Sequence, residues 1–207
     1  MYLQNNWGEY LNCVGEHIWI SLLAFILAAL IGIPVGYFCV THKKLERYVT
    51  GFFQVLRIIP SVAILILLIP ILGVGIKPAM VALVLLAIPP VLMNTATGFQ
   101  EVPDFMLETA QGLGMTKKQI LWQVKVPQAL PMIFAGLKIA LVEIIASATI
   151  AAKIGAGGLG GIILTGLGLN RTDMLLVGGI SVAVLSLVAS FLFGRVEKAM
   201  MKYRYLS

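Results

Sequence analysis

Long apolar segments dominate this sequence and limit its fold more than any other feature. The first, residues 18–40, runs for 23 residues without a charged side chain. About 20 predominantly apolar residues are enough for a helix to cross a hydrocarbon core of about 30 Å. By this criterion the chain is predicted to cross a membrane five times, at residues 18–40, 49–72, 79–99, 131–154 and 174–194.

The spans are expected to be helices, because backbone groups in lipid must be satisfied within the segment. Continuous apolar runs also lack the alternation of a membrane β-barrel. Only 12% of the residues are charged, about half the usual share of a soluble domain. The predicted fold class is therefore all-α, a polytopic membrane helical bundle that forms one transmembrane domain over residues 1–207.

Basic residues gather in three clusters that lie between or after the spans. With five spans, all three clusters lie on one side, and positive charge favours the cytoplasmic side. This pattern predicts an N-terminus outside and a C-terminus inside, and it differs from the single basic face of a nucleic-acid-binding protein. The clusters are Lys43, Lys44 and Arg47; Lys117, Lys118 and Lys125; and Arg195, Lys198, Lys202 and Arg204.

Two cysteines and two histidines flank the first span. Residues 13 and 39 are 26 positions apart, roughly 39 Å along a helix, so no disulfide between Cys13 and Cys39 is expected. His17 and His42 lie on opposite sides of the span and cannot share a metal. The start of the chain lacks a basic n-region, and we expect it to be retained as the first span.

No constellation for catalysis is present in the sequence. There is no Walker A pattern, so the chain is not expected to bind ATP by that route, and no nucleophile or acid–base set suggests an enzyme. Residues 155–160 formally match G-x-G-x-x-G, but a dinucleotide site needs a preceding strand and a βαβ unit. We expect tight packing or a re-entrant turn near a translocation path instead, with a flexible loop as the alternative. The glycines concerned are Gly155, Gly157, Gly158 and Gly160.

The polar segment between the third and fourth spans, residues 100–130, is predicted to fold as two short helices. Asp104 is the expected N-cap of the first, and Gly112-Leu113-Gly114 ends it. Thr116 and Gln119 fit a capping box at the start of the second, and Pro127 is expected to end it. Periodicity alone favours an ordinary amphipathic loop that lies on the membrane surface.

The spacing within this loop resembles the EAA loop of ABC importer permeases. That pattern is Glu-Ala-Ala, three residues, Gly, nine residues, and Ile-x-Leu-Pro. The chain keeps Glu108, Ala110, Gly114 and Pro127 at the matching offsets and departs at Thr109, Val124 and Val126. The resemblance implies a coupling loop that docks on a cytoplasmic ATPase dimer, which binds the ATP and magnesium. The implied coupling residues are Glu108, Ala110, Gly114, Val124, Val126 and Pro127.

Further segments look like the osmoprotectant branch of these permeases, which imports glycine betaine, carnitine or choline. They are residues 57–63, 68–70, 154–160 and 163–170. The resemblance implies a type I importer fold with the five-helix core of methionine importer permeases, in a bacterial cytoplasmic membrane. It also implies a second permease copy or paralogue and an external substrate-binding protein, with membrane lipid around the bundle. The alternatives are a permease for another solute such as methionine, or an ion-coupled secondary transporter.

Polar residues within the spans are the candidates for a translocation path. An unpaired charge at mid-bilayer costs about 2.5–3.5 kcal/mol, so Glu143 should face protein or water. It could attract a cationic solute, pair with Lys138 or Arg57, or lie at a dimer interface. The uncharged candidates could line a path or bond across helices. The candidate path residues are Asn94, Thr97, Glu143 and Thr149.

Overall fold

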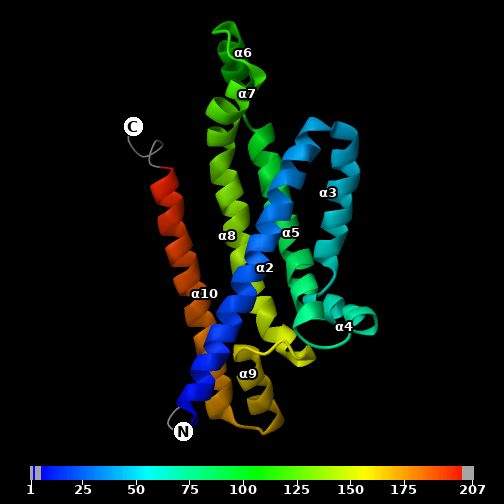
Figure 1. Ribbon diagram of the computed structural model, residues 1–207, viewed down its shortest axis with the longest axis vertical. Coiled ribbons are helices and arrows are strands. Elements are labelled where there is room, and N and C mark those ends of the chain that lie inside the picture. The colour runs from blue at the N-terminus through cyan, green and yellow to red at the C-terminus, as the bar shows by residue number, and fades with distance from the viewer. Residues whose placement is uncertain (1, 3–5, 202–207) are drawn as a thin grey trace.

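Helices make up the regular structure of the described residues. The computed structural model describes residue 2 and residues 6–201, the side chains of residues 43–45 excepted. Four long apolar helices run along the length of the molecule (Figure 1). They are α2 (Trp7–Thr41), α5 (Ile76–Gln100), α8 (Val126–Ala151) and α10 (Thr172–Met200). The predicted all-helical membrane bundle is confirmed.

The second predicted span, residues 49–72, is bent and not one continuous helix. It consists of α3 (Lys43–Ile58) and α4 (Ser61–Leu72), and the two axes make an angle of 100°. Ile59 between them is extended, with φ −72° and ψ 123°, because the ring of a following proline disfavours the helical conformation. The prediction of five spans holds when this bent pair counts as one span.

Helix α5 lies at the centre of the bundle, with α2 on one side and α8 on the other. Of its most apolar 18 residues 61% are buried, against 6% for α10. Small residues allow the close approach: a Cβ built on Gly36 of α2 would lie 2.6 Å from the Leu92 carbonyl oxygen of α5. Helix α10 is therefore a peripheral element, with most of its surface left for lipid or another chain.

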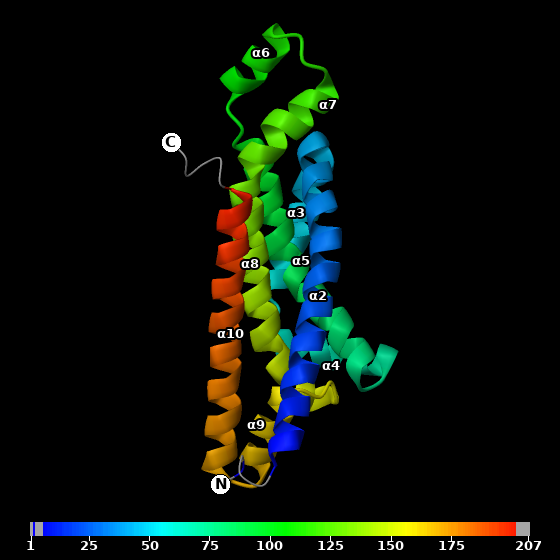
Figure 2. The same ribbon diagram turned by 60° about the vertical axis from the view of Figure 1, so that its left-hand side comes forward.

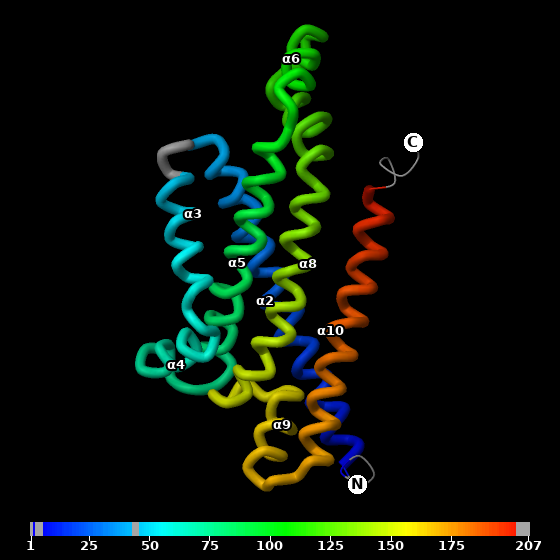
Figure 3. Tube along the Cα trace, turned by 180° about the vertical axis from the view of Figure 1, so that it is seen from behind, coloured from blue at the N-terminus to red at the C-terminus, as the bar shows by residue number. Residues whose placement is uncertain are grey.

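The two ends of the bundle differ in composition. One end holds the α2–α3 turn, the helices α6 (Asp104–Gly112) and α7 (Lys117–Gln119), and the last turns of α10 (Figures 1 and 3). The opposite end holds the start of α2, at residue 7, and the short helix α9 (Leu159–Gly168). The three basic clusters therefore share one end, as predicted, although Lys202 and Arg204 fall outside the described residues.

Candidate functional site

An elbow formed by residues 104–126 projects beyond the end of the bundle (Figure 2). Its first arm is α6, which begins at Asp104 with Pro103 as the N-cap residue and no side-chain capping bond. The prediction of Asp104 as the cap is therefore wrong by one position, because proline already supplies the extended conformation that precedes the helix. Asp104 lies in the first turn, where a carboxylate interacts favourably with the helix dipole.

The tip of the elbow is a Schellman turn. The Met115 amide donates to the Ala110 carbonyl oxygen at 3.1 Å, and the Gly114 amide donates to Gln111 at 2.9 Å. Gly114 has φ +75°, a left-handed conformation that glycine adopts without steric cost. The predicted break between the two short helices is confirmed, and Ala110 and Gly114 belong to the same hydrogen-bonded turn.

The second arm begins with the predicted capping box. The Gln119 amide donates to Thr116 Oγ1 at 3.4 Å, and the Thr116 amide donates to Gln119 Oε1 at 2.8 Å. A π-helical turn, η1 (Ile120–Lys125), then leads directly into α8.

Pro127 does not end the second arm, so that prediction is wrong. It lies in the first turn of α8, directly after the π-helical turn, so the helix is continuous across it. The π-helical turn just before it bonds with a longer spacing, which accommodates the missing amide hydrogen. The helix that contains the fourth predicted span therefore already begins before residue 131.

The exposed surface of the elbow is partly apolar. Glu108 is exposed, whereas Ala110 is buried inside the turn. Three large apolar side chains stand out: Phe105 is 68% exposed, Leu113 77% and Trp122 62%. Their exposure was not predicted from the sequence; for Leu113 the available signal was its place between the two glycines of the turn.

The two valines of the predicted coupling motif are less accessible than this surface. Val124 and Val126 are both half-buried. Val126 packs against the cluster of Phe99, Ala129 and Ile133 where α5 meets α8. Its role in the fold is thus to anchor the elbow to the bundle, while Leu113 and Phe105 face outward.

Two of the candidate path residues lie on α5. Asn94 is half-buried and donates from Nδ2 to the Pro90 carbonyl oxygen at 2.8 Å. A Cβ built on Gly136 of α8 would lie 2.7 Å from the Asn94 Cβ, so the two helices touch there. Thr97 follows about one turn later on α5 and is also half-buried.

The other two candidates lie further along α8. Glu143 is seven residues beyond Gly136, which places it on the same helix face about 10 Å away. Thr149 Oγ1 donates to the Ile145 carbonyl oxygen at 3.4 Å. Thr149 lies 13 positions after Gly136, or roughly 20 Å further along the helix. The four candidates are therefore spread along the bundle rather than gathered in one pocket.

Glu143 has two basic residues as its candidate structural partners. Among the described side chains, Glu143 forms no ion pair with Lys138 or Arg57; the ion pair present joins Arg171 and Asp173 at 2.6 Å. The Lys138 ammonium instead lies over Gly194 of α10, 3.9 Å from a Cβ built there. Lys138 is therefore directed to another helix.

The glycine-rich segment is an ordered turn that leads into α9. Gly155, Gly157 and Gly158 have φ between +77° and +87°, and the Gly158 amide donates to Glu16 Oε2 at 2.9 Å. A Cβ on Gly160 would collide with the Thr149 carbonyl oxygen. The segment is tightly packed against α2 and α8, which agrees with the packing interpretation and not with a flexible loop.

Glu16 and His17 have a role at this end that was not predicted from the sequence. His17 is 1% exposed, and its Nε2 lies 3.1 Å from the Ile145 carbonyl oxygen. A Cβ on Gly158 would lie 3.1 Å from His17 Nδ1. The available signal was two adjacent polar residues at the start of an apolar span. Together they hold the glycine-rich turn against α8.

Comparison with known proteins agrees with this geometry. Residues 21–202 match the family described as binding-protein-dependent transport system inner membrane component. The carnitine transport permease protein OpuCB of Listeria monocytogenes is 40% identical over 95% of this chain and 90% of its own length. The choline transport system permease protein OpuBB of Bacillus subtilis (strain 168) is 39% identical over 95% of this chain and 91% of its own length.

Solved structures with a similar fold include the methionine ABC transporter MetNI in inward-facing conformations. A native crystal form has a TM-score of 0.78 at 24% identity, with 94% of this chain and 95% of that chain covered. A selenomethionine-soaked form has a TM-score of 0.73 at 25% identity, with 91% of this chain and 92% of that chain covered. The bundle with its projecting elbow is thus a fold seen in solved ABC transporters.

Proposed function

Because this chain belongs to the family of binding-protein-dependent transport inner membrane components, we propose that it is the permease subunit of an ATP-driven importer for a small quaternary-ammonium osmoprotectant. Membership in this family makes it a translocation subunit of the inner membrane and not an enzyme. The solute class rests on one observation: relatives matching 95–96% of the chain at 34–40% identity are named for carnitine, glycine betaine, choline or osmoprotectants.

The proposed partners follow from the two ends of the molecule. At the basic end, the elbow offers exposed Leu113 and Phe105 beside Glu108 to a groove on a cytoplasmic ATPase. That ATPase dimer would bind ATP and magnesium, and a second permease copy or paralogue would complete the pair. At the opposite end, a substrate-binding protein would deliver the solute.

The path of mechanical coupling is proposed to run along one helical element. Residues Lys117–Ile154 form a single stretch of 38 helical residues, from the second arm of the elbow past Glu143 and Thr149. Its far end meets the glycine-rich turn that Glu16 and His17 hold. A displacement of the elbow would therefore reach the candidate path directly, without an intervening flexible joint.

Reconstitution tests this function. The permease, its cognate ATPase and its binding protein are placed in proteoliposomes, and uptake of radiolabelled glycine betaine, carnitine and choline is measured with ATP or a non-hydrolysable analogue. We expect ATP-dependent uptake of at least one of them. Methionine uptake alone would support the alternative of a permease for another solute. Uptake driven by an ion gradient, by this chain without the ATPase, would support a secondary transporter.

A further inference from the structure

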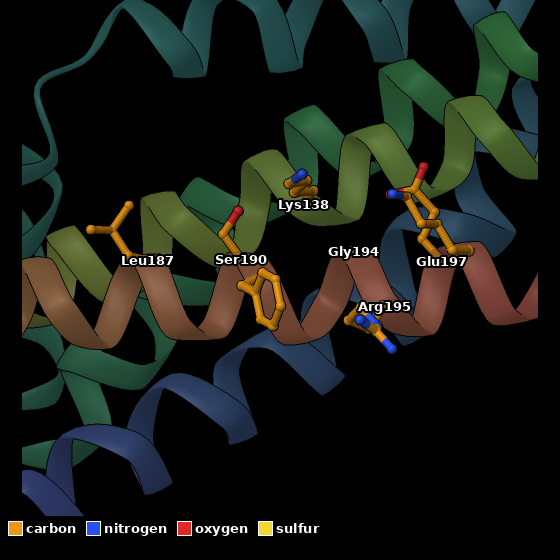
Figure 4. Close-up of a pocket in the computed structure, with 8 residues that line it drawn as sticks. Lys138, Leu187, Ser190, Gly194, Arg195 and Glu197 are labelled. Carbon is orange, nitrogen blue, oxygen red and sulfur yellow. The ribbon is translucent and has the colours of Figure 1, made fainter.

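A groove of about 370 Å³ lies between α8 and α10 near the basic end of the bundle. Figure 4 shows Lys138 entering from α8, while Ser190, Gly194 and Glu197 belong to α10. Gly194 leaves room for the Lys138 ammonium, which would lie 3.9 Å from a Cβ at that position. The groove therefore brings a charged group of one membrane helix to the surface of another.

The groove has an excess of positive charge. Lys138, Arg195 and Lys198 line it, and Glu197 is the one carboxylate among its lining residues. Among the described side chains, none of these four groups takes part in an ion pair. Lys198 is four residues after Gly194, so it lies on the same face of α10 one turn further on. The lining therefore carries two net positive charges, which an anion from outside the protein can neutralise.

The length of the uncharged run in α10 leads us to expect the groove at the boundary between hydrocarbon and headgroups. The uncharged part of α10, residues 174–194, contains 21 residues, or roughly 31 Å of helix, which matches a hydrocarbon core of about 30 Å. Lys138 reaches the last residue of that run, and Leu187 and Phe191 on the apolar side are 71% and 65% exposed. Cations thus stand directly beside a surface suited to an acyl chain.

We propose that this groove binds one anionic phospholipid of the cytoplasmic leaflet. The phosphate lies between Lys138 and Lys198, with Arg195 within reach of the same headgroup, and one acyl chain lies along Leu187 and Phe191. The Glu197 carboxylate accepts a hydrogen bond from a headgroup hydroxyl, which favours phosphatidylglycerol. The inference goes beyond solute transport and does not depend on the identity of the solute.

Native mass spectrometry of the full chain in mild detergent tests the proposal. Phosphatidylglycerol or phosphatidylcholine with matched acyl chains is titrated in, and the fraction of protein that retains one lipid is measured. We expect preferential retention of phosphatidylglycerol and about a fivefold weaker apparent affinity in Lys138→Gln and in Lys198→Gln, the loss expected for one cation near an anionic headgroup. Lys138→Arg keeps the charge and should restore the preference.

Lys153→Gln is the matched control, because Lys153 is an exposed cation at the other end of the same helical stretch. It should leave the preference unchanged. Equal retention of both lipids by the unmodified chain, or an unchanged preference in Lys198→Gln, would overturn the proposal. An equal loss of phosphatidylglycerol affinity in Lys153→Gln would also overturn it, because that loss would indicate nonspecific attraction by any cation. Cross-linking of Lys138 to an acidic residue of a second copy or of the ATPase, with no lipid preference, would assign the groove to a protein partner.

Discussion

Two glycines in the elbow, only two positions apart, have different backbone requirements. Gly114 has φ +75° and closes the Schellman turn, whereas Gly112 is the last residue of α6 with open space around it. In the left-handed conformation a side chain costs about 1–2 kcal/mol. A methyl group is therefore expected to be unfavourable at Gly114 and tolerated at Gly112, although no neighbouring atom lies close to either position.

Gly114→Ala is expected to weaken coupling while leaving the membrane bundle folded. The strain falls on a turn outside the bundle, so the tip of the elbow should lose its fixed geometry and solute-stimulated ATP hydrolysis should fall severalfold. The measurement is ATPase activity of the reconstituted complex with and without the loaded binding protein. Gly112→Ala is the control and should behave like the unmodified chain; equal activity in both variants would contradict the role given to the turn.

Glu143→Gln tests whether the half-buried carboxylate acts on a cationic solute. We expect uptake to fall severalfold with normal assembly, since the amide keeps the shape of the side chain and removes its charge. Uptake in proteoliposomes and co-purification with the ATPase are the two measurements. Normal uptake with normal assembly would remove Glu143 from the path, and failed assembly would assign it to a contact between subunits.

At the scale of helices, close backbone approach decides how the bundle packs. Helix α5 contacts both α2 and α8 through small residues, and Gly136 faces the Pro90 carbonyl oxygen and Asn94. In membranes, where lipid is as apolar as the helix faces, such close packing is a main source of association. The bend at Pro60 is also set at this scale, because it lets α4 fold over against α5.

Gly136→Ala is expected to destabilise the contact between α5 and α8. The added Cβ would lie 2.7 Å from the Pro90 carbonyl oxygen, and overpacking of this kind typically costs about 1–3 kcal/mol. A lower thermal unfolding midpoint in detergent would show it. Gly161→Ala in α9 meets nothing within 4 Å and should not change the midpoint; an equal drop in both variants would instead indicate a general effect on helix packing.

For the whole molecule, the arrangement of charge defines which end faces the cell interior. The elbow, the α2–α3 turn and the end of α10 share one end (Figure 1), and these are the segments that bear the basic clusters. The opposite end is poor in cations and holds the glycine-rich turn. Energy from ATP hydrolysis is therefore expected to enter at the basic end and solute at the other.

Cysteine labelling checks this orientation. In a background with Cys13 and Cys39 replaced by alanine, Lys77→Cys should react with an impermeant maleimide added to whole cells, because residue 77 is exposed at the start of α5. Lys117→Cys, exposed on the elbow, should react only after the cytoplasmic membrane is permeabilised. The reverse pattern would invert the orientation and remove the proposed contact with an ATPase.

The sequence by itself determined the apolar segments long enough to span a membrane, the shared side of the basic clusters and the two-armed elbow with its glycine turn and capping box. These depend on apolar length, charge and hydrogen bonds between residues close in the chain, all of which are local properties. Only the tertiary structure decided where α4 packs after the break at Pro60, and which groups Lys138 and His17 meet. In each of these cases the outcome depends on which helix lies alongside, and residues far apart in the chain supply that neighbour.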